Sequence, residues 1–383
     1  MSFNLPWEGE QKHLKKIVIS GYYGFNNGGD EAILESLIKT IKELSAKLNT
    51  GIDITVLSND PEATYAKHGV KSIYRFNPFM MVKYILASDI LISGGGSLIQ
   101  DMTSTRSLFY YIFIIELAHF FRKKIYIYAN GVGPIRRSIS AKLTKNAFGK
   151  ADIITLRDKD SYELLKKIGV KSPRMYVSLD PVFTLDYISS ATAADLLKKE
   201  GIEAEDFITV SVRNWENREN FTAHMAKLLD YISENYGRRI VFINMRHPKD
   251  VATSKLIAGK MRSVSNILSS SYTPSELIGI ISLSKYCLSM RLHGLIFAAK
   301  AGVPGMALSY DPKINSFAEE FGMPVCSDTE NLDYNKARAT IDEFESRLEH
   351  YKNLIYTNAE RTHERKLLNA ELLEKLLKDE ITK

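Results

Sequence analysis

The chain has 383 residues, which is too long for one ordinary hydrophobic core and long enough for two domains. Hydrophobic residues make up 45% and charged residues 25%, a composition typical of a soluble globular protein. With 51 Lys and Arg against 45 Asp and Glu, the net charge of +6 suits small anionic substrates or an anionic membrane surface, and we expect no nucleic-acid partner.

Cysteine usage and hydropathy predict a cytoplasmic protein. Cys287 and Cys326 belong to no CxxC or Cys/His metal pattern, so we expect buried, reduced thiols. The start, MSFNLPWEGEQKHLKK, lacks the apolar core of a signal peptide, and no apolar run reaches the roughly 18 residues of a transmembrane helix. The most apolar helix candidate, 107–121, is expected to lie buried beside a sheet, with contact to membrane lipid as the alternative.

In the first half of the chain, short apolar runs alternate with amphipathic segments, which is typical of parallel strands and helices. We therefore expect a parallel sheet with helices on both faces, and loops that gather at the carboxyl ends of its strands. The predicted strands are 16–20, 53–57, 71–75, 89–93, 124–129 and 153–157, and the predicted helices are 31–48, 61–68, 107–121 and 160–168.

The first strand-end loop, 21–30, reads GYYGFNNGGD. It is neither a GxGxxG fingerprint nor a P-loop, because no Gly-Lys-Ser/Thr ends it. Close approach to a phosphate, close approach to a sugar and a simple tight turn all remain open. Asn26 and Asn27 can donate and accept hydrogen bonds at once, which suits sugar hydroxyls, whereas Asp30 is a site residue or the N-cap of the following helix.

Two further loops follow predicted strands. In SGGGSLIQD, Gly95 and Gly96 leave the backbone bare, which permits either a ligand to approach or a tight turn, and Gln100 and Asp101 follow. In NGVGPIRR, two arginines either reach an anionic substrate or cover a solvated helix start. These arginines are Arg136 and Arg137. At the end of the next strand, Arg157 is expected to pair locally with Asp158.

A second strand–helix series follows a predicted linker at 182–190, where Pro181 and a loss of periodicity mark a break. Arg213 and His247 end two of its strands and are secondary site candidates, with surface salt bridges as the alternative. The predicted strands are 207–212, 239–245, 266–268, 286–290 and 303–309, and the predicted helices are 220–236, 274–281, 295–301, 332–356 and 359–378.

The most informative stretch, 286–313, reads YCLSMRLHGLIFAAKAGVPGMALSYDPK. Two buried strands flank a helix, so Arg291, His293 and Lys313 should gather at one sheet edge near a helix N-terminus, which favours an anion. One imidazole among permanent cations indicates acid–base chemistry on a phosphorylated substrate. The alternative is that Arg291 and His293 cap a helix and pair with nearby carboxylates.

The segments SMRLHG and AGVPGMALSYDPK resemble the polysaccharide pyruvyltransferases, as do GYYGFNNGGDEAIL, SGGGSLIQD and TLRDKDSYELL. The resemblance runs from about residue 16 to about residue 324. It implies a GT-B-like fold of two Rossmann-like domains across a cleft. We expect residues 1–182 on the acceptor side, 183–350 on the phosphoenolpyruvate side, and a C-terminal helix within 351–383 that packs back on the N-terminal domain.

This resemblance implies transfer of pyruvate from phosphoenolpyruvate to a sugar as a cyclic ketal, with release of phosphate. The expected acceptor contains N-acetylmannosamine, is lipid-linked or nucleotide-linked, and belongs to cell-wall polysaccharide biosynthesis and S-layer anchoring. The protein would then work at the inner face of the plasma membrane. Phosphoenolpyruvate is a co-substrate, and we expect no cofactor and no metal, because no carboxylate cluster is present to hold one.

Roles follow from the chemistry of that reaction. His293 is the candidate general acid. The candidate donor-binding residues are Arg291, Lys313, Gly294, Arg136, Arg137 and Arg213. Arg136 and Arg137 are included because the resemblance implies that an arginine of the N-terminal domain also contacts the donor. The candidate acceptor-binding residues are Asn26, Asn27, Asp30, Gly95, Gly96, Gln100 and Asp101.

Two other functions remain open. One is a nucleotide-sugar-dependent glycosyltransferase or epimerase on the same fold, which would bind a UDP- or GDP-sugar. The other is a non-enzymatic sugar-binding protein, which has no need of three basic residues at one sheet edge.

Overall fold

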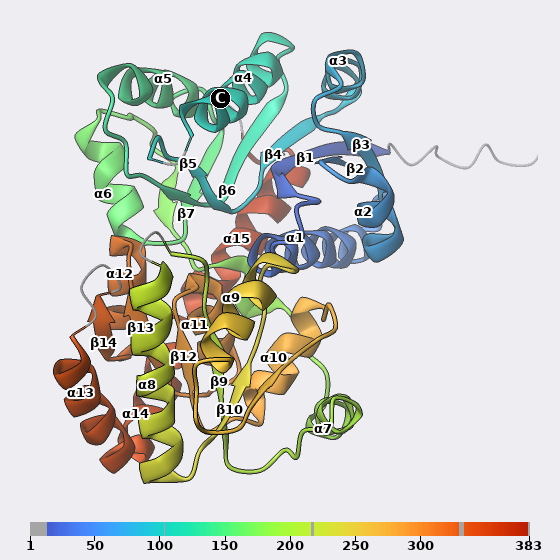
Figure 1. The fold of residues 1–383 in the computed structure, drawn as a ribbon. Helices are drawn as coiled ribbons and strands as arrows, with labels where there is room; N and C mark the ends of the chain where they lie inside the picture. Colours follow the sequence, from blue (N-terminus) through green and yellow to red (C-terminus); the bar gives the residue numbers. More distant parts are fainter. Residues whose placement is uncertain (1–13, 103, 216–217, 329–332, 382–383) are drawn as a thin grey trace, which may run out of the picture.

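The computed structural model describes residues 14–102, 104–215, 218–328 and 333–381 (Figure 1). The start of the chain, where we expect no signal-peptide core, and residue 332, where one predicted helix begins, lie outside these ranges. Two parallel sheets, each covered by helices, lie in two halves of the molecule. The predicted α/β fold class is confirmed.

The N-terminal sheet has the strand order β3-β2-β1-β4-β6-β7-β8, with β5 paired to the end of β6. Its strands read as apolar runs because both faces are covered, and Ile17, Val18 and Ile19 of β1 are all buried. The strands are β1 (Lys15–Tyr23), β2 (Ile52–Ser58), β3 (Lys71–Tyr74), β4 (Ile90–Ser93), β5 (Gly96–Ile99), β6 (Lys124–Val132), β7 (Ile153–Leu156) and β8 (Met175–Val177). The helices are α1 (Gly28–Lys47), α2 (Pro61–His68), α3 (Pro78–Ala87), α4 (Thr105–Phe120), α5 (Ser138–Phe148) and α6 (Lys159–Lys167).

The C-terminal sheet has the order β11-β10-β9-β12-β13-β14, again with parallel neighbours. Its strands are β9 (Phe207–Ser211), β10 (Arg239–Phe242), β11 (Ser265–Ile267), β12 (Cys287–Ser289), β13 (Gly305–Ser309) and β14 (Val325–Asp328). The helices are α7 (Ser190–Lys199), α8 (Arg218–Tyr236), α9 (Lys249–Ala258), α10 (Pro274–Ser282), α11 (Leu292–Lys300), α12 (Pro312–Phe321) and α13 (Tyr334–Ser346).

The two halves share packed surfaces as well as chain connections. The segment predicted as a linker begins with a short 3₁₀ helix, η1 (Pro181–Thr184), whose Val182 is buried in a core that includes Ala32 and Ile33 of α1. After α14 (Leu348–Arg361), helix α15 (His363–Leu377) returns to the N-terminal half. There its leucines pack in the core formed by β1 and α1, so the two domains are connected at more than one place.

Several elements were absent from the sequence prediction. Helices α3, α5, α7, α9 and α12 and strands β5, β8 and β14 are short or weakly periodic, so little local signal marks them. Strand β5 occupies part of the glycine-rich loop at 94–101, where Gly96 has a φ of +95°. Helix α11 begins at Leu292, three residues earlier than 295, which places His293 in its first turn. Cys287 and Cys326 are buried free thiols.

Candidate active site

Polar side chains from both domains meet where the carboxyl end of one sheet faces that of the other. The first turns of α1, α11 and α12 supply Asp30, His293 and Lys313, respectively. Strand β5 and the segments after β7 and β8 supply the remaining members of the group, which are Ser97, Arg157 and Asp180. Ligands of open parallel sheets bind at this place, so we treat these residues as the candidate site.

His293 is held between the two domains. Its Nε2 lies 3.7 Å from Oδ2 of Asp180, and its side chain is 15% exposed. Gly29 supports the ring from the N-terminal domain, since a Cβ on Gly29 would lie 2.0 Å from Nδ1 of His293. The buried Nε2 atom makes no hydrogen bond of normal length and faces the carboxylate of Asp180.

Asp180 is a buried carboxylate that faces two cationic groups. Its Oδ2 accepts a hydrogen bond of 3.0 Å from Nη1 of Arg157. Burial alone would raise the pKa of Asp180, but the neighbouring His293, the charge of Arg157 and the Val182 N–H outweigh burial and lower that pKa. Asp180 is therefore ionised near neutral pH, and it fixes the position of both cationic partners.

Arg157 and Lys313 converge on one hydroxyl. Nη2 of Arg157 donates to Oγ of Ser97 at 2.8 Å, and Nζ of Lys313 donates to the same atom at 3.2 Å. Burial and the charge of Arg157 lower the pKa of Lys313 to about 8, partly offset by Asp158 and Asp311. Two cations this close repel each other, and a bound dianion would relieve that repulsion.

A cavity of about 350 Å³ opens beside these cations. It is lined by Arg157, Asp158, Lys159, Asp160, Leu179, Asp180, Leu292, Ile296, Lys313, Ser316, Phe317, Glu319 and Glu320. This volume lies within the range of small-ligand pockets. Asp158 and Asp180 contact Arg157 on the same wall, so an anionic ligand would have to bind through the N–H groups of Arg157 and Lys313 that point away from these carboxylates.

Asp30 is buried close to His293 and has an unusual proton affinity. Burial raises the pKa of Asp30 to about 6, although the charges of His293 and Arg157 oppose this shift. The side-chain amide of Asn27 donates to Asp30. Gly96 packs against the carboxyl group, because a Cβ there would lie 2.7 Å from Oδ1. Asn27, and not Asp30, is the N-cap residue of α1.

The structure separates Arg291 from the other basic residues of the predicted donor group. Its guanidinium pairs with the buried carboxylate of Asp250, as in the alternative interpretation of this residue. Ser289 orients the backbone, since its Oγ accepts from the Arg291 N–H at 3.0 Å. Gly294 lies against Ser289, where a Cβ would approach Oγ to 2.3 Å. Arg291 therefore positions the start of α11 and carries a charge that Asp250 compensates.

The remaining donor candidates lie apart from Ser97. Arg136 and Arg137 have exposed side chains, and their backbone N–H groups donate to Asp101 at 2.8 and 2.9 Å. Asp101 thereby holds the start of α5. Arg213 donates to the hydroxyl of Tyr310 at 2.9 Å and stacks over its ring.

The acceptor candidates occupy different surroundings. Asn26 has a φ of +54° and lines a second cavity between the domains. Gly95 packs against Ile33 of α1, and Gln100 accepts from the Met102 N–H at 2.9 Å. His247, the secondary candidate, lines the same second cavity as Asn26.

Sequence reasoning missed the roles of Arg157, Asp180 and Ser97. Arg157 lies 3.9 Å from its sequence neighbour Asp158, so the expected local pair exists, but the shorter contact joins Arg157 to Asp180. A usable signal was present, because Arg157 directly follows a buried strand and therefore lies at the ligand-binding edge of the sheet.

The structure also bears on metals and membranes. Within the described ranges, His, Cys, Asp and Glu side chains form no group of three or more that is arranged to hold a metal ion. Of the helices that the structure describes, none combines the length and apolar character needed to cross a bilayer.

Comparison with known proteins gives one family. The polysaccharide pyruvyl transferase family matches residues 27–312. The amylovoran biosynthesis protein AmsJ of Erwinia amylovora is 20% identical over 381 residues, which cover 83% of this chain and 89% of AmsJ.

Solved structures with similar folds are GT-B-like nucleotide-sugar enzymes. MnaA of S. aureus with UDP aligns with a TM-score of 0.63 and 15% identity, covering 93% of this chain and 97% of MnaA. UDP-GlcNAc 2-epimerase of Neisseria meningitidis with UDP-GlcNAc aligns with a TM-score of 0.62 and 15% identity, covering 95% of this chain and 100% of the epimerase. HepE of Anabaena with UDP-glucose aligns with a TM-score of 0.62 and 11% identity, covering 94% of this chain and 99% of HepE. At these identities the likeness establishes the fold alone, and the predicted GT-B-like arrangement is confirmed.

Proposed function

The chain belongs to the polysaccharide pyruvyl transferase family, and on that premise we propose that it transfers pyruvate from phosphoenolpyruvate to two hydroxyls of a sugar as a cyclic ketal, with release of phosphate. The observation that carries this proposal is the convergence of Arg157 and Lys313 on Ser97 beside His293. One site thus offers two cations for an anionic donor and one imidazole for proton transfer.

The donor would bind with its phosphate towards Arg157 and Lys313. Both groups donate hydrogen bonds to Ser97, and each has further N–H groups that can donate hydrogen bonds to a phosphate or carboxylate. Arg157 is fixed by Asp180, so the guanidinium is oriented before the ligand arrives. Preorganised cations also stabilise the negative charge that develops on a departing phosphate, which is why we propose that no divalent metal is required.

The proton chemistry begins at His293. Its imidazolium gives a proton to the methylene carbon of phosphoenolpyruvate, and the π electrons form the new C–H bond. The adjacent carbon becomes oxocarbenium-like, and an oxygen of the first sugar hydroxyl bonds to it. Asp30 accepts the proton of that hydroxyl, for which a carboxylate with a pKa of about 6 is suited.

Ring closure completes the ketal. The bond between carbon and phosphate oxygen breaks with its electron pair on phosphate, and the second hydroxyl bonds to the same carbon. The proton of the second hydroxyl returns to the now neutral His293, and the proton on Asp30 leaves with inorganic phosphate. Two hydroxyl protons are thus accounted for, one in the new methyl group and one on phosphate.

The acceptor that we propose is a sugar of a cell-surface polysaccharide precursor, with N-acetylmannosamine as the first candidate. The family and the distant relationship to an amylovoran biosynthesis protein support a role in polysaccharide biosynthesis. A lipid-linked precursor would place the reaction at the inner face of the plasma membrane.

The test is incubation with phosphoenolpyruvate and the methyl glycoside of N-acetylmannosamine in D₂O, in the presence of EDTA. We expect phosphate release that requires both substrates, and a product methyl group that carries one deuterium from the solvent. Phosphate release without a sugar-bound methyl group would contradict ketal formation. Turnover of UDP-GlcNAc without phosphoenolpyruvate would favour the epimerase or glycosyltransferase function that the structural neighbours carry out. Full loss of activity in EDTA, restored by magnesium, would contradict the metal-free proposal.

A further inference from the structure

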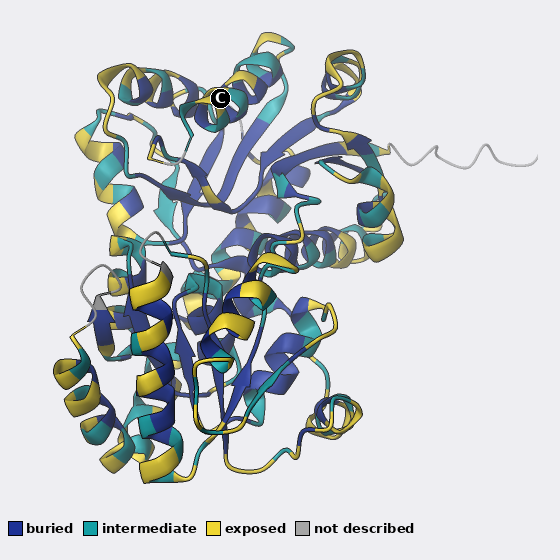
Figure 2. Cartoon of the chain, viewed as in Figure 1, coloured by how far each residue is buried: buried dark blue, intermediate teal, exposed yellow. Residues whose placement is uncertain are grey.

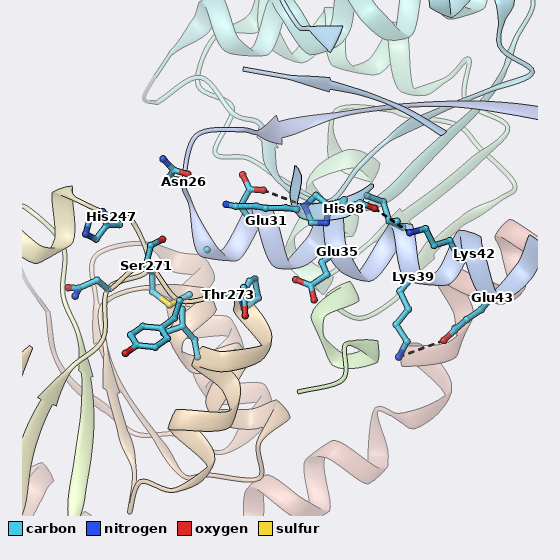
Figure 3. Close-up of a pocket in the computed structure, with 18 residues that line it drawn as sticks. Asn26, Glu31, Glu35, Lys39, Lys42, Glu43, His68, His247, Ser271 and Thr273 are labelled. Atoms are coloured by element: carbon cyan, nitrogen blue, oxygen red, sulfur yellow. Dashed lines mark hydrogen bonds and ion pairs between the residues drawn. The ribbon is translucent and has the colours of Figure 1, made fainter. Parts of the chain in front are cut away.

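A second and larger cavity, of about 510 Å³, lies between the domains along helix α1 (Figure 3). Its α1 wall consists of residues at helical spacing, so the cavity follows one face of this helix outwards from the N-terminus. The opposite wall comes from the segment after β10 and from the start of α10. The lining residues are Asn26, Gly28, Glu31, Glu35, Ile38, Lys39, Lys42, Glu43, Lys67, His68, Asn244, Met245, His247, Ser271, Tyr272, Thr273, Pro274 and Leu277.

Two polar groups inside this groove lack protein partners. The His68 side chain is only 7% exposed, yet its Nε2 has no hydrogen-bond partner and lies 3.9 Å from Glu31. Burial raises the pKa of Glu35, and in the described part of the chain its carboxyl group forms no hydrogen bond or ion pair. Nε2 of His68 is buried without a hydrogen bond and Glu35 is half-buried, so a ligand that supplies hydrogen bonds would be favoured here.

The chemistry of the groove fits carbohydrate. Carboxyl and imidazole groups on the α1 side face a wall that combines apolar Met245 and Leu277 with polar side chains such as Thr273. A sugar ring likewise presents hydroxyls at its edge and C–H groups on its faces. A phosphate is a poorer fit, because Glu31 and Glu35 would repel it. Of the lysines at the outer end, Lys39 is already paired with Asp186 and Lys42 bonds the His68 carbonyl.

The groove is next to the catalytic residues. Gly28 lines the groove, and Gly29, the following residue, packs on the ring of His293. A sugar in the groove would therefore adjoin a sugar placed at His293. We propose that the groove binds the sugar units next to the one that receives pyruvate, so that the preferred acceptor is an oligosaccharide. This inference rests on the proposed function.

Acceptors of different length test it. The probes are the methyl glycoside of N-acetylmannosamine and a disaccharide with N-acetylmannosamine at its non-reducing end, and the variant is Glu35→Gln. We expect KM for the disaccharide to rise about tenfold, as for loss of one hydrogen bond to a charged group. KM for the monosaccharide and for phosphoenolpyruvate should stay within twofold. Glu62→Gln, an exposed change on α2 outside the groove, is the matched control.

An equal effect of Glu35→Gln on both acceptors, or none on either, would overturn the groove proposal. Saturation-transfer NMR with the disaccharide separates this result from failure of the proposed function. Loss of disaccharide binding in Glu35→Gln would support the groove even if no pyruvyl transfer occurs. Unchanged binding in that variant would overturn it.

A different observation concerns the outer face of the N-terminal domain, formed by α3, α4 and α5 (Figure 1). Large apolar side chains are exposed there, including Phe79 at 86% and Phe120 at 76%. Figure 2 shows exposed positions along these helices. On α4, the exposed Phe109, Phe113 and Phe120 lie within one narrow arc at 100° per residue. Exposed apolar patches of this kind mark interaction surfaces.

The charge of this face is strongly positive. The three helices contain four Lys and Arg against one Glu, and the flanking segments add Arg122, Lys123, Arg136 and Arg137 against Asp101. Among the acidic residues, Asp101 caps α5 and Glu116 pairs with Lys150. Lys83, Arg106 and Arg122 are exposed beside the phenylalanines. Apolar side chains within a basic surface fit an anionic lipid bilayer, whereas two copies of this face would repel each other.

We infer that the α3–α4–α5 face docks on an anionic membrane surface, with the phenylalanines of α4 inserted between lipid headgroups. The test is co-sedimentation of the full chain with vesicles of phosphatidylcholine, with or without an equal amount of phosphatidylglycerol. We expect binding to the anionic vesicles, weakened by salt. The variant Phe113→Ser/Phe120→Ser should bind at least about tenfold more weakly, whereas Val264→Ser, which changes an 85% exposed side chain of the C-terminal domain, should bind normally.

Equal binding to both kinds of vesicle, or to neither, would overturn this inference. Loss of a dimer in the phenylalanine variant, measured by light scattering, would show instead that the face binds a second copy. Activity on the methyl glycoside reports on the proposed function alone, and we expect it to be the same in the variant as in the wild type.

Discussion

Nη1 of Arg157 lies 3.0 Å from Oδ2 of Asp180, and both side chains are at most 5% exposed. The same carboxylate oxygen faces Nε2 of His293. One buried carboxylate thus links a cation of the proposed donor site to the proposed general acid, across the boundary between the two domains.

Replacing Asp180 should reveal this link. Asp180→Asn keeps the shape but removes the carboxylate that bonds Arg157 directly and leaves Asp158, 3.9 Å away, beside the buried guanidinium. Breaking a buried pair typically costs about 3–5 kcal/mol, so we expect the free energy of unfolding to fall by an amount of that order in urea titrations. Turnover should also fall, because His293 loses its facing charge. Wild-type stability together with wild-type turnover would contradict this account.

His293→Gln tests the general acid. Glutamine keeps hydrogen-bonding capacity but cannot supply a proton near neutral pH. General acid catalysis contributes about 10²–10⁴-fold, so kcat should fall within that range while KM for phosphoenolpyruvate and the melting temperature change little. A variant with normal turnover would remove His293 from the mechanism, and a variant that does not fold would assign it a structural role.

Lys313→Ala should act mainly on the donor. A hydrogen bond to a charged group is worth about 1.5–3 kcal/mol, so KM for phosphoenolpyruvate should rise roughly ten- to a hundredfold, with a smaller change for the sugar. Lys336→Ala, on the exposed face of α13, is the control. An unchanged donor constant would show that Lys313 serves only to pack beside Ser97.

The pH dependence of kcat/KM for phosphoenolpyruvate should have two limbs, because this ratio reports groups of the free enzyme. Below about pH 6, Asp30 becomes protonated and can no longer accept a hydroxyl proton. Above about pH 8, Lys313 loses its proton and therefore its charge. Lys313→Arg, which stays charged, should remove the part of the alkaline limb that Lys313 causes above about pH 8, and Asp30→Asn should lower activity and abolish the acid limb. Persistence of either limb unchanged in its variant would assign that limb to another group.

Adjacent glycines offer a test of geometry. A Cβ at Gly29 would lie 2.0 Å from Nδ1 of His293, whereas one at Gly28 would first meet the Met245 carbonyl at 3.1 Å. Gly29→Ala should therefore displace the imidazole and lower kcat by at least about tenfold. Gly28→Ala, one residue away in the same helix turn, should be much less harmful to kcat. Equal effects of the two changes would mean that the ring can move without loss of function.

Some of this could be predicted without coordinates, because it depends on local pattern. Helix α2 begins and ends at the predicted residues, 61 and 68, since Pro61 follows a capping Asp60 and Gly69 ends the helix in the left-handed conformation. The buried strand before Arg291 and the helix after it were likewise predicted from apolar runs. His293 and Lys313 stand out because they occupy the strand-end positions of a parallel sheet, where position along the chain already implies position at the edge.

The amino-acid sequence by itself therefore determined the alternation of strands and helices, the fold class, and the two basic residues of the C-terminal half that begin helices at the sheet edge. Only the tertiary structure decided which groups those residues meet. Ser97 lies 60 residues from Arg157 and 216 residues from Lys313 along the chain. Arg157 forms its hydrogen bond with Asp180, 23 residues away, and not with its neighbour Asp158. Periodicity reports which face of an element is buried, whereas these contacts depend on how two separately folded sheets are set against each other, and no local pattern of residues carries that information.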